Sequence, residues 1–271
     1  AGLPAAAFSD PDFRRIFAPR GEPLAEGEML RQEELSATLA RIRLRGPGEF
    51  YTGDLAATLA RELGDMAGIN VPTDAFRAYR PMWTKSEFVI VGNDELHLPG
   101  GPDGVRAAAI WRALSDNIPL PADTPPVSFD SAGFVATDRA GGAAACVVSA
   151  NGTVGAGRII GHSGMIAAAL PRGDDFPGLP MVLVNKPQMD ARGVAAGSGG
   201  VAGIMRVLRA AVPTFGGDGA LDRILSALPG EGGPAGRVNM IYCPEGVRRG
   251  PATCRFQADP GGHGLATSAA L

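Results

Sequence analysis

Apolar residues recur at helical spacing in the first part of the chain. Leu35, Leu39 and Ile42 follow one another at i, i+4 and i+7, with acids at the start of the run and arginines at its end. This pattern predicts a helix over residues 30–46. A spacing of four predicts a second helix over residues 53–63. Residues 72–79 are interpreted as a turn followed by a short helix, and residues 105–114 as a helix with Asp103 as its N-cap.

Short apolar runs bounded by glycine or proline dominate the rest of the chain and predict strands. These runs cover residues 87–91, 133–137, 143–150, 181–184, 193–196, 237–242 and 253–257. The turn Asp-Arg-Ala-Gly-Gly joins the second and third runs into a hairpin. Helices are predicted over 200–212, opened by Gly-Ser-Gly-Gly, and over 218–228, capped by Asp218, whereas residues 96–104 are interpreted as a loop.

Four prolines lie within residues 117–126, so this segment can form neither a helix nor a central strand. We interpret it as the boundary between two halves. In the second half, strand pairs are followed by helices, which predicts sheets covered by helices. The expected fold class is therefore α+β, with a layered αββα arrangement.

Composition narrows the functional classes. The 271 residues are 45% hydrophobic and 20% charged, with a net charge of −3, so neither a disordered chain nor a nucleic-acid-binding protein is expected. No run approaches the roughly 18 apolar residues that a membrane span requires. No basic segment precedes an apolar one at the N-terminus, which favours a cytoplasmic location over secretion.

Neither a metal nor an organic cofactor is expected. The chain has three cysteines and three histidines: Cys146, Cys243, Cys254, His97, His162 and His263. Their spacing argues against a zinc site and against a disulfide framework, and we expect the cysteines to pack in the core. The Gly-Ser-Gly-Gly loop lacks the G-x-G-x-x-G spacing and no P-loop lysine follows it, so a nucleotide-binding module is a weak alternative.

Several blocks, in order, carry a family resemblance. Residues 131–138 read Ser-Ala-Gly-Phe-Val-Ala-Thr-Asp, residues 147–151 read Val-Val-Ser-Ala-Asn, and residues 197–200 read Gly-Ser-Gly-Gly. An Asp-Pro-Gly-Gly-His-Gly block follows at 259–264. These blocks resemble the small subunit of γ-glutamyltransferases, which are N-terminal-nucleophile hydrolases, and residues 30–79 resemble their large subunit.

The resemblance implies a truncated large-subunit-like segment at residues 1–130 and a small-subunit-like segment at residues 131–271. Together they are expected to form one compact domain, an αββα N-terminal-nucleophile hydrolase-like sandwich. In such an enzyme, cleavage before the nucleophile frees an α-amino group that acts as general base.

The implied catalytic residues are Ser131, Asn151, Gly199 and Gly200. Ser131 falls on the family's nucleophilic threonine, and Asn151 falls on the asparagine that orients it. The backbone N–H groups of Gly199 and Gly200 would stabilise the oxyanion. The implied substrates are γ-glutamyl compounds such as glutathione.

Several departures weaken the catalytic interpretation. Ala132 replaces the second threonine, whose hydroxyl supports the first, and residues 176–179 read Phe-Pro-Gly-Leu where the family has a Ser-Ser block. Asp175 matches the substrate-binding acidic residue only across a gap, and a solvated acidic loop is the interpretation we favour for it. The segment that carries the family's carboxylate-binding arginine also has no counterpart in this chain.

Two hypotheses follow from this balance. In the first, the protein is a catalytically degenerate γ-glutamyltransferase-like protein that acts as an accessory or structural subunit, with protein partners in a homo- or hetero-complex. In the second, it is an active γ-glutamyl amide hydrolase or transpeptidase, and Ser131 is its autoprocessed nucleophile. Cleavage of the Asp130–Ser131 bond distinguishes them.

Overall fold

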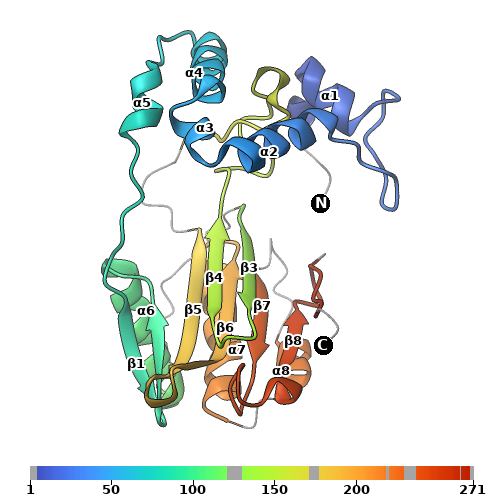
Figure 1. Ribbon diagram of the computed structural model, residues 1–271. Helices are drawn as coiled ribbons and strands as arrows, with labels where there is room; N and C mark the ends of the chain where they lie inside the picture. Colours follow the sequence, from blue (N-terminus) through green and yellow to red (C-terminus); the bar gives the residue numbers. More distant parts are fainter. Residues whose placement is uncertain are drawn as a thin grey trace. The chain divides into compact units, whose positions relative to one another are not determined.

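The computed structural model describes residues 5–120, 130–170, 177–217, 220–228, 236–262 and 264–268 (Figure 1). The chain forms two compact units, which we call the helical unit and the sheet unit. The helical unit comprises Ala1–Trp83 and Ala150–Leu170, and the sheet unit comprises Thr84–Ser149 and Pro171–Leu271. The expected division between residues 130 and 131 concerns a cleavage point rather than packing, and it stays a prediction.

The helical unit contains short helices around two small apolar cores. Its helices are η1 (Ala5–Ser9), α1 (Pro11–Phe17), α2 (Glu33–Arg45), α3 (Gly48–Tyr51), α4 (Asp54–Ala67), α5 (Thr73–Ala78) and η2 (Gly161–Ser163). Phe13 and Ile16 of α1 pack against Ile159 in one core, and Leu55 and Leu59 of α4 form part of the other. The segment 150–170 therefore contributes to both cores although it is distant in sequence.

The predicted helix over 30–46 forms as α2, and its apolar stripe is buried in part. Ile42 packs against the core that contains Leu55 and Leu59, whereas the Leu39 side chain is 57% exposed. Thr38 is buried and donates a hydrogen bond from its hydroxyl to the Ser163 carbonyl at 2.9 Å. Periodicity located the helix correctly, but the side that packs includes a threonine that the apolar pattern did not indicate.

The sheet unit is built on a six-stranded antiparallel sheet in the order β1-β2-β5-β6-β7-β8. Its strands are β1 (Glu87–Val91), β2 (Asp94–Leu98), β5 (Gly178–Asn185), β6 (Asp190–Ser198), β7 (Arg237–Tyr242) and β8 (Arg255–Ala258). A separate hairpin consists of β3 (Ala132–Thr137) and β4 (Ala143–Val148). The helices are α6 (Pro102–Ser115), α7 (Val201–Phe215) and α8 (Leu221–Ala227), and the turns include η3 (Lys186–Gln188) and η4 (Pro251–Thr253).

Three layers are stacked in this unit, as Figure 1 shows. The three helices cover one face of the six-stranded sheet, and the main core lies between these helices and the sheet. The hairpin packs on the other face over β5, β6 and β7. At Gly133 a Cβ atom would lie 3.0 Å from the Ala196 side chain, so the absence of a side chain allows the hairpin to approach β6 closely. These layers are the αββ part of the predicted αββα order.

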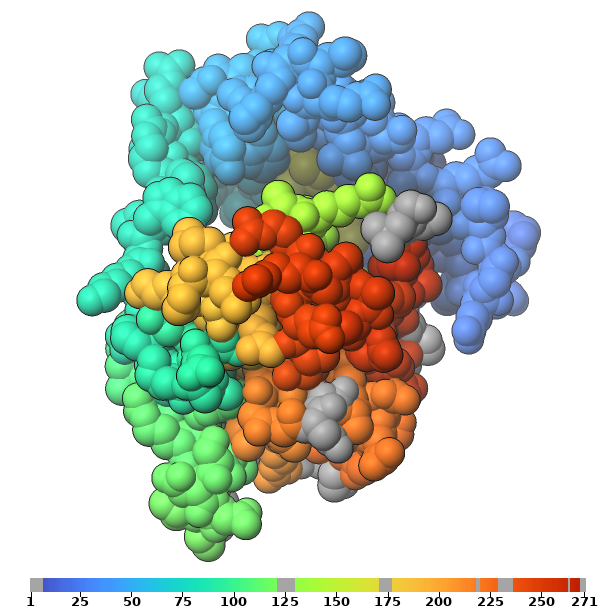
Figure 2. Space-filling view, turned by 60° about the horizontal axis from the view of Figure 1, so that its bottom comes forward, coloured from blue at the N-terminus to red at the C-terminus, as the bar shows by residue number. Residues whose placement is uncertain are grey.

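The turns at one end of the sheet are fixed by a buried carboxylate. Figure 2 shows the gold connection between β5 and β6 against the red connection between β7 and β8. There Asp190, which is 1% exposed, accepts hydrogen bonds from the backbone N–H groups of Arg248 (3.0 Å) and Arg249 (3.3 Å). The backbone of this arginine pair therefore binds a buried acid.

Three sequence-based expectations are corrected. Residues 96–98, interpreted as loop, belong to β2. Helix α6 begins at Pro102 after Gly101, so Asp103 lies inside the helix instead of capping it.

Cys243 and Cys254 form a disulfide, with Cα atoms 4.0 Å apart. Because Tyr242 pairs with Arg255, the two cysteines follow directly opposite each other at the end of the β7–β8 pair. A spacing of eleven residues does not reveal this register.

Candidate functional site

Ser131 lies directly before β3, at the open end of the hairpin. The register pairs Ala132 with Val148, which places Ser131 opposite Ser149. The strands hold this position because the hairpin is fixed on β5, β6 and β7. The predicted nucleophile is therefore attached to a packed element rather than to a free loop.

The turn between β6 and α7 directs a backbone donor at Ser131. Gly199 and Gly200 have φ values of 101° and 66°, in the left-handed region that favours glycine. In this conformation the N–H of Gly199 donates a hydrogen bond to Ser131 Oγ at 2.8 Å. The structure thus brings two of the predicted site residues together, and the predicted oxyanion donor, Gly199 N–H, binds the Ser131 hydroxyl oxygen.

One backbone carbonyl, that of Pro177, occupies the space beside them. It accepts a hydrogen bond from Ser131 Oγ at 2.5 Å and another from the Gly200 N–H at 3.0 Å. The second predicted oxyanion donor is therefore engaged by the protein's own backbone. Pro177 lies within the block that replaces the Ser-Ser pair, so a carbonyl acceptor stands where the resemblance implies hydroxyl donors.

A second serine contacts the bond whose cleavage would activate the nucleophile. Ser149 Oγ donates a hydrogen bond to the Asp130 carbonyl oxygen at 2.7 Å. A donor on this oxygen polarises the carbonyl that Ser131 Oγ would attack. Sequence reasoning missed Ser149, although the predicted hairpin contained the signal, because its register places this residue opposite Ser131.

Asn151 belongs to the helical unit and Ser131 to the sheet unit, so the orienting role of Asn151 stays a prediction. Its backbone is left-handed, with φ of 57°, and its side-chain amide donates to the Ala169 carbonyl at 2.9 Å. The Ala169 N–H in turn donates to the Ala150 carbonyl. Asn151 thus joins the two ends of the segment 150–170. Asp175 lies outside the described residues.

A buried ion pair anchors the helix that follows the glycine turn. Arg206 of α7 and Asp259 are 12% and 2% exposed at their side chains, and Arg206 Nε lies 2.6 Å from an Asp259 oxygen. Asp259 also accepts hydrogen bonds from the N–H groups of Val238 and Gly261. Asp259 therefore holds α7, β7 and the turn that follows β8 together.

No three His, Cys, Asp or Glu side chains among the described residues gather in a way that could hold a metal ion. Within the same residues, no helix is long and apolar enough to cross a membrane.

Residues 4–125 match the family model described as Gamma-glutamyltranspeptidase. Glutathione hydrolase 3 of Arabidopsis thaliana is 31% identical over 100 residues, which are 37% of this chain and 16% of that protein. The glutathione hydrolase proenzyme of Bacillus subtilis is 43% identical over 53 residues, or 20% of this chain and 9% of that protein. Residues 4–125 of this chain are thus similar to γ-glutamyltransferases, and the chain spans less than a fifth of the length of these relatives.

A solved structure is similar in fold over most of the chain. Cephalosporin acylase from Bacillus halodurans has a TM-score of 0.63 and 16% identity, and the likeness covers 94% of this chain and 68% of the acylase. At this identity the likeness concerns the fold alone, and together with the helices and the antiparallel sheet it confirms the predicted α+β fold class. The family match ends before Ser131, so the roles of the site residues remain predictions.

Proposed function

We propose that this γ-glutamyltransferase-like protein is catalytically degenerate and serves as an accessory or structural subunit of a larger complex. The observation that carries the proposal is the Pro177 carbonyl, which accepts hydrogen bonds from both Ser131 Oγ and the Gly200 N–H. Catalysis needs a donor directed at the developing oxyanion, and loss of one such donor lowers the rate by about 100- to 1,000-fold. A site whose donors are engaged internally has little capacity to stabilise that charge.

The residues around the nucleophile support the same conclusion. Ala132 has no hydroxyl with which to assist Ser131, and the Gly199 N–H donates to the nucleophile rather than to an open position. The missing hydroxyl at position 132 and the engaged Gly199 N–H affect acyl transfer and also peptide cleavage. Both reactions pass through a tetrahedral oxyanion next to Ser131 Oγ. We therefore expect little processing and little hydrolysis.

Exposed apolar side chains on the sheet unit support a role in a complex. Phe134, Val148 and Phe256 are 53%, 48% and 39% exposed, on or beside the hairpin. Clusters of exposed apolar surface often serve as protein interfaces. Light scattering coupled to size exclusion, on protein from its native source, should report a mass above that of the same protein after denaturation. Equal native and denatured masses would count against the subunit role.

The activity test uses γ-glutamyl-p-nitroanilide, which releases a coloured amine when the γ-glutamyl bond breaks. We expect no hydrolysis above that of Ser131→Ala, because the site lacks a free oxyanion donor pair. The matched control is Ser36→Ala, which removes an exposed hydroxyl from α2. Hydrolysis that Ser131→Ala abolishes and Ser36→Ala leaves unchanged would refute the degenerate proposal.

The second candidate is an active γ-glutamyl amide hydrolase or transpeptidase, and one contact favours it. Ser149 Oγ donates to the Asp130 carbonyl, which is the polarisation that autoprocessing at Ser131 requires. Under this candidate, Ser149→Ala slows cleavage of the Asp130–Ser131 bond, and γ-glutamyl compounds such as glutathione are the substrates. If the protein is processed, the Ser149→Ala variant should accumulate the uncleaved chain.

A further inference from the structure

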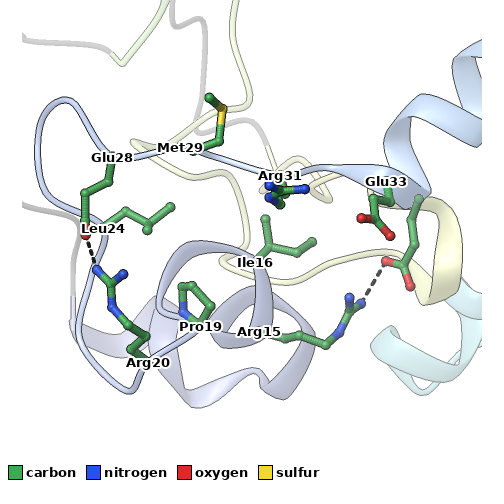
Figure 3. Close-up of a pocket in the computed structure, with 10 residues that line it drawn as sticks. Arg15, Ile16, Pro19, Arg20, Leu24, Glu28, Met29, Arg31 and Glu33 are labelled. Atoms are coloured by element: carbon green, nitrogen blue, oxygen red, sulfur yellow. Dashed lines mark hydrogen bonds and ion pairs between the residues drawn. The ribbon is translucent and has the colours of Figure 1, made fainter.

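The helical unit contains a recess that the proposed function does not use. It has a volume of about 610 Å³ and lies between α1, the segment 18–32 and the first turn of α2 (Figure 3). Small-molecule sites in proteins typically have volumes of about 300–1,000 Å³. Its lining residues are Arg15, Ile16, Pro19, Arg20, Leu24, Glu28, Met29, Arg31, Glu33 and Glu34. The recess is therefore large enough for an amino acid or a short peptide.

Backbone hydrogen bonds give the segment 18–32 a defined path around the recess. The Leu24 N–H donates to the Phe17 carbonyl at 2.9 Å, which returns the chain to the end of α1. The Ala25 N–H donates to the Glu28 carboxylate at 2.7 Å, and the Glu28 N–H donates to the Ala25 carbonyl at 3.1 Å. The wall of the recess is thus formed by hydrogen-bonded turns.

Two ion pairs lie at opposite ends of the recess in Figure 3, with Ile16 between them. Arg15 pairs with Glu34 at 2.8 Å, and Arg20 pairs with Glu28. The hydrogen bond to Glu34 raises the pKa of the Arg15 guanidinium, whereas the Ala25 N–H and then Arg20 lower the pKa of the Glu28 carboxyl. These four charges therefore neutralise one another in two pairs.

One cation and one anion of the lining remain. The side chains of Arg31 and Glu33 make no hydrogen bond or ion pair with any other described residue, although both line the recess. Ile16, which is 6% exposed, together with Leu24 and Met29 supplies an apolar surface beside them. The recess thus combines one available guanidinium, one available carboxylate and an apolar wall.

We propose that this recess binds an amino acid or short peptide with a free amino group, a free carboxylate and an apolar side chain. Arg31 would bind the carboxylate, since a guanidinium matches that group's planar geometry, and Glu33 would bind the ammonium group. The wall formed by Ile16, Leu24 and Met29 would hold the apolar side chain. This binding site is separate from Ser131, which belongs to the other unit, so the proposal does not depend on the activity of that residue.

Isothermal titration of the full chain with L-leucine and with L-leucyl-L-leucine tests the proposal. The pair of ligands also distinguishes a free amino acid from a short peptide. We expect saturable binding of at least one of them. N-acetyl-L-leucine amide, which lacks both charges, should bind at least about tenfold more weakly, as hydrogen bonds to charged groups generally contribute that much. Glycine or glycylglycine should also bind about tenfold or more weakly, because the apolar contact is lost.

Variants localise the binding to the recess. Arg31→Gln and Glu33→Gln should each weaken binding about tenfold or more, whereas Arg43→Gln, at an exposed arginine of α2 outside the recess, should leave it unchanged. Circular dichroism verifies that the variants are folded. The proposal is wrong if neither zwitterion binds saturably, if the amide binds equally well, or if Arg43→Gln weakens binding as much as Arg31→Gln.

Discussion

Single residues determine which hydrogen bonds surround the candidate site. The Pro177 carbonyl contacts Ser131 across 46 positions of sequence, and the Ser149 hydroxyl contacts the Asp130 carbonyl. The first contact engages the hydroxyl proton of Ser131, whereas the second polarises the carbonyl of the Asp130–Ser131 bond. Chemistry at Ser131 therefore depends on a balance between an acceptor and a donor that the peptide backbone positions.

Removal of Asp259 should destabilise the fold strongly. The carboxylate is buried with Arg206 and also accepts two backbone N–H groups. Breaking a buried pair from one side typically costs about 3–5 kcal/mol. We expect Asp259→Ala to lower the free energy of unfolding by this amount in urea titrations, and Asp116→Ala, at an exposed position, to change it little. Equal and small effects of both variants would contradict the structural role of the pair.

Tyr242 should make stability decrease at high pH. Burial raises the pKa of its phenol, the Asp94 carboxylate adds to that effect, and Arg192 opposes it. The unfolded chain therefore loses this proton first as the pH rises past about 10, so the free energy of unfolding falls there. Absorbance titration should show a tyrosine that ionises above the usual phenol pKa of about 10, and Tyr242→Phe should remove that late step. A late step that persists in Tyr242→Phe, or its absence from the parent protein, would contradict the prediction.

At the scale of elements, local pattern located most of the secondary structure. β1 and β7 have the predicted limits, and the β3–β4 hairpin forms where its turn was expected. β2 was missed because its first residue, Asp94, is buried through partners that are distant in sequence. Asn185 donates to it at 2.7 Å, and Arg192 pairs with it at 3.0 Å. A polar residue that is buried by distant partners has no local signature.

The candidate site shows the same division between local and distant information. The β6–α7 glycine turn could be predicted, since a Gly-Ser-Gly-Gly sequence before a helix indicates positive φ angles. The Pro177 contact could not, because it joins the backbone carbonyl before β5 to the side chain before β3. Backbone carbonyls are present at every residue, so no residue type indicates which one will accept.

The Cys243–Cys254 disulfide should stabilise the end of the β7–β8 pair. It closes a short loop, for which restriction of the unfolded chain predicts a stabilisation of about 2–3 kcal/mol. We expect a reductant to lower the urea midpoint, Cys254→Ser to reproduce that shift, and Cys146→Ser to leave the effect of reductant intact. Thiol titration of the denatured, unreduced protein should find one free thiol, and three would refute the bond.

At the scale of the whole molecule, the likeness to a solved structure concerns the fold and leaves the chemistry of the site to experiment. The α+β fold is similar to that of the acylase over 94% of the chain. The donors expected for that architecture are nevertheless engaged internally around Ser131. A fold of this kind can position a serine without activating it, because the fold depends on packing and catalysis depends on the direction of a few hydrogen bonds.

The bond between Asp130 and Ser131 provides the most direct test, because an N-terminal nucleophile requires its cleavage and an accessory role does not. The measurement is intact-mass spectrometry of the purified protein, with Ser131→Ala as the matched control. We predict an uncleaved chain in both samples, since Pro177 holds the Ser131 hydroxyl and Gly200 is not free to stabilise an oxyanion. Two fragments divided before Ser131, present in the parent protein and absent from Ser131→Ala, would contradict the degenerate site and establish an autoprocessed enzyme.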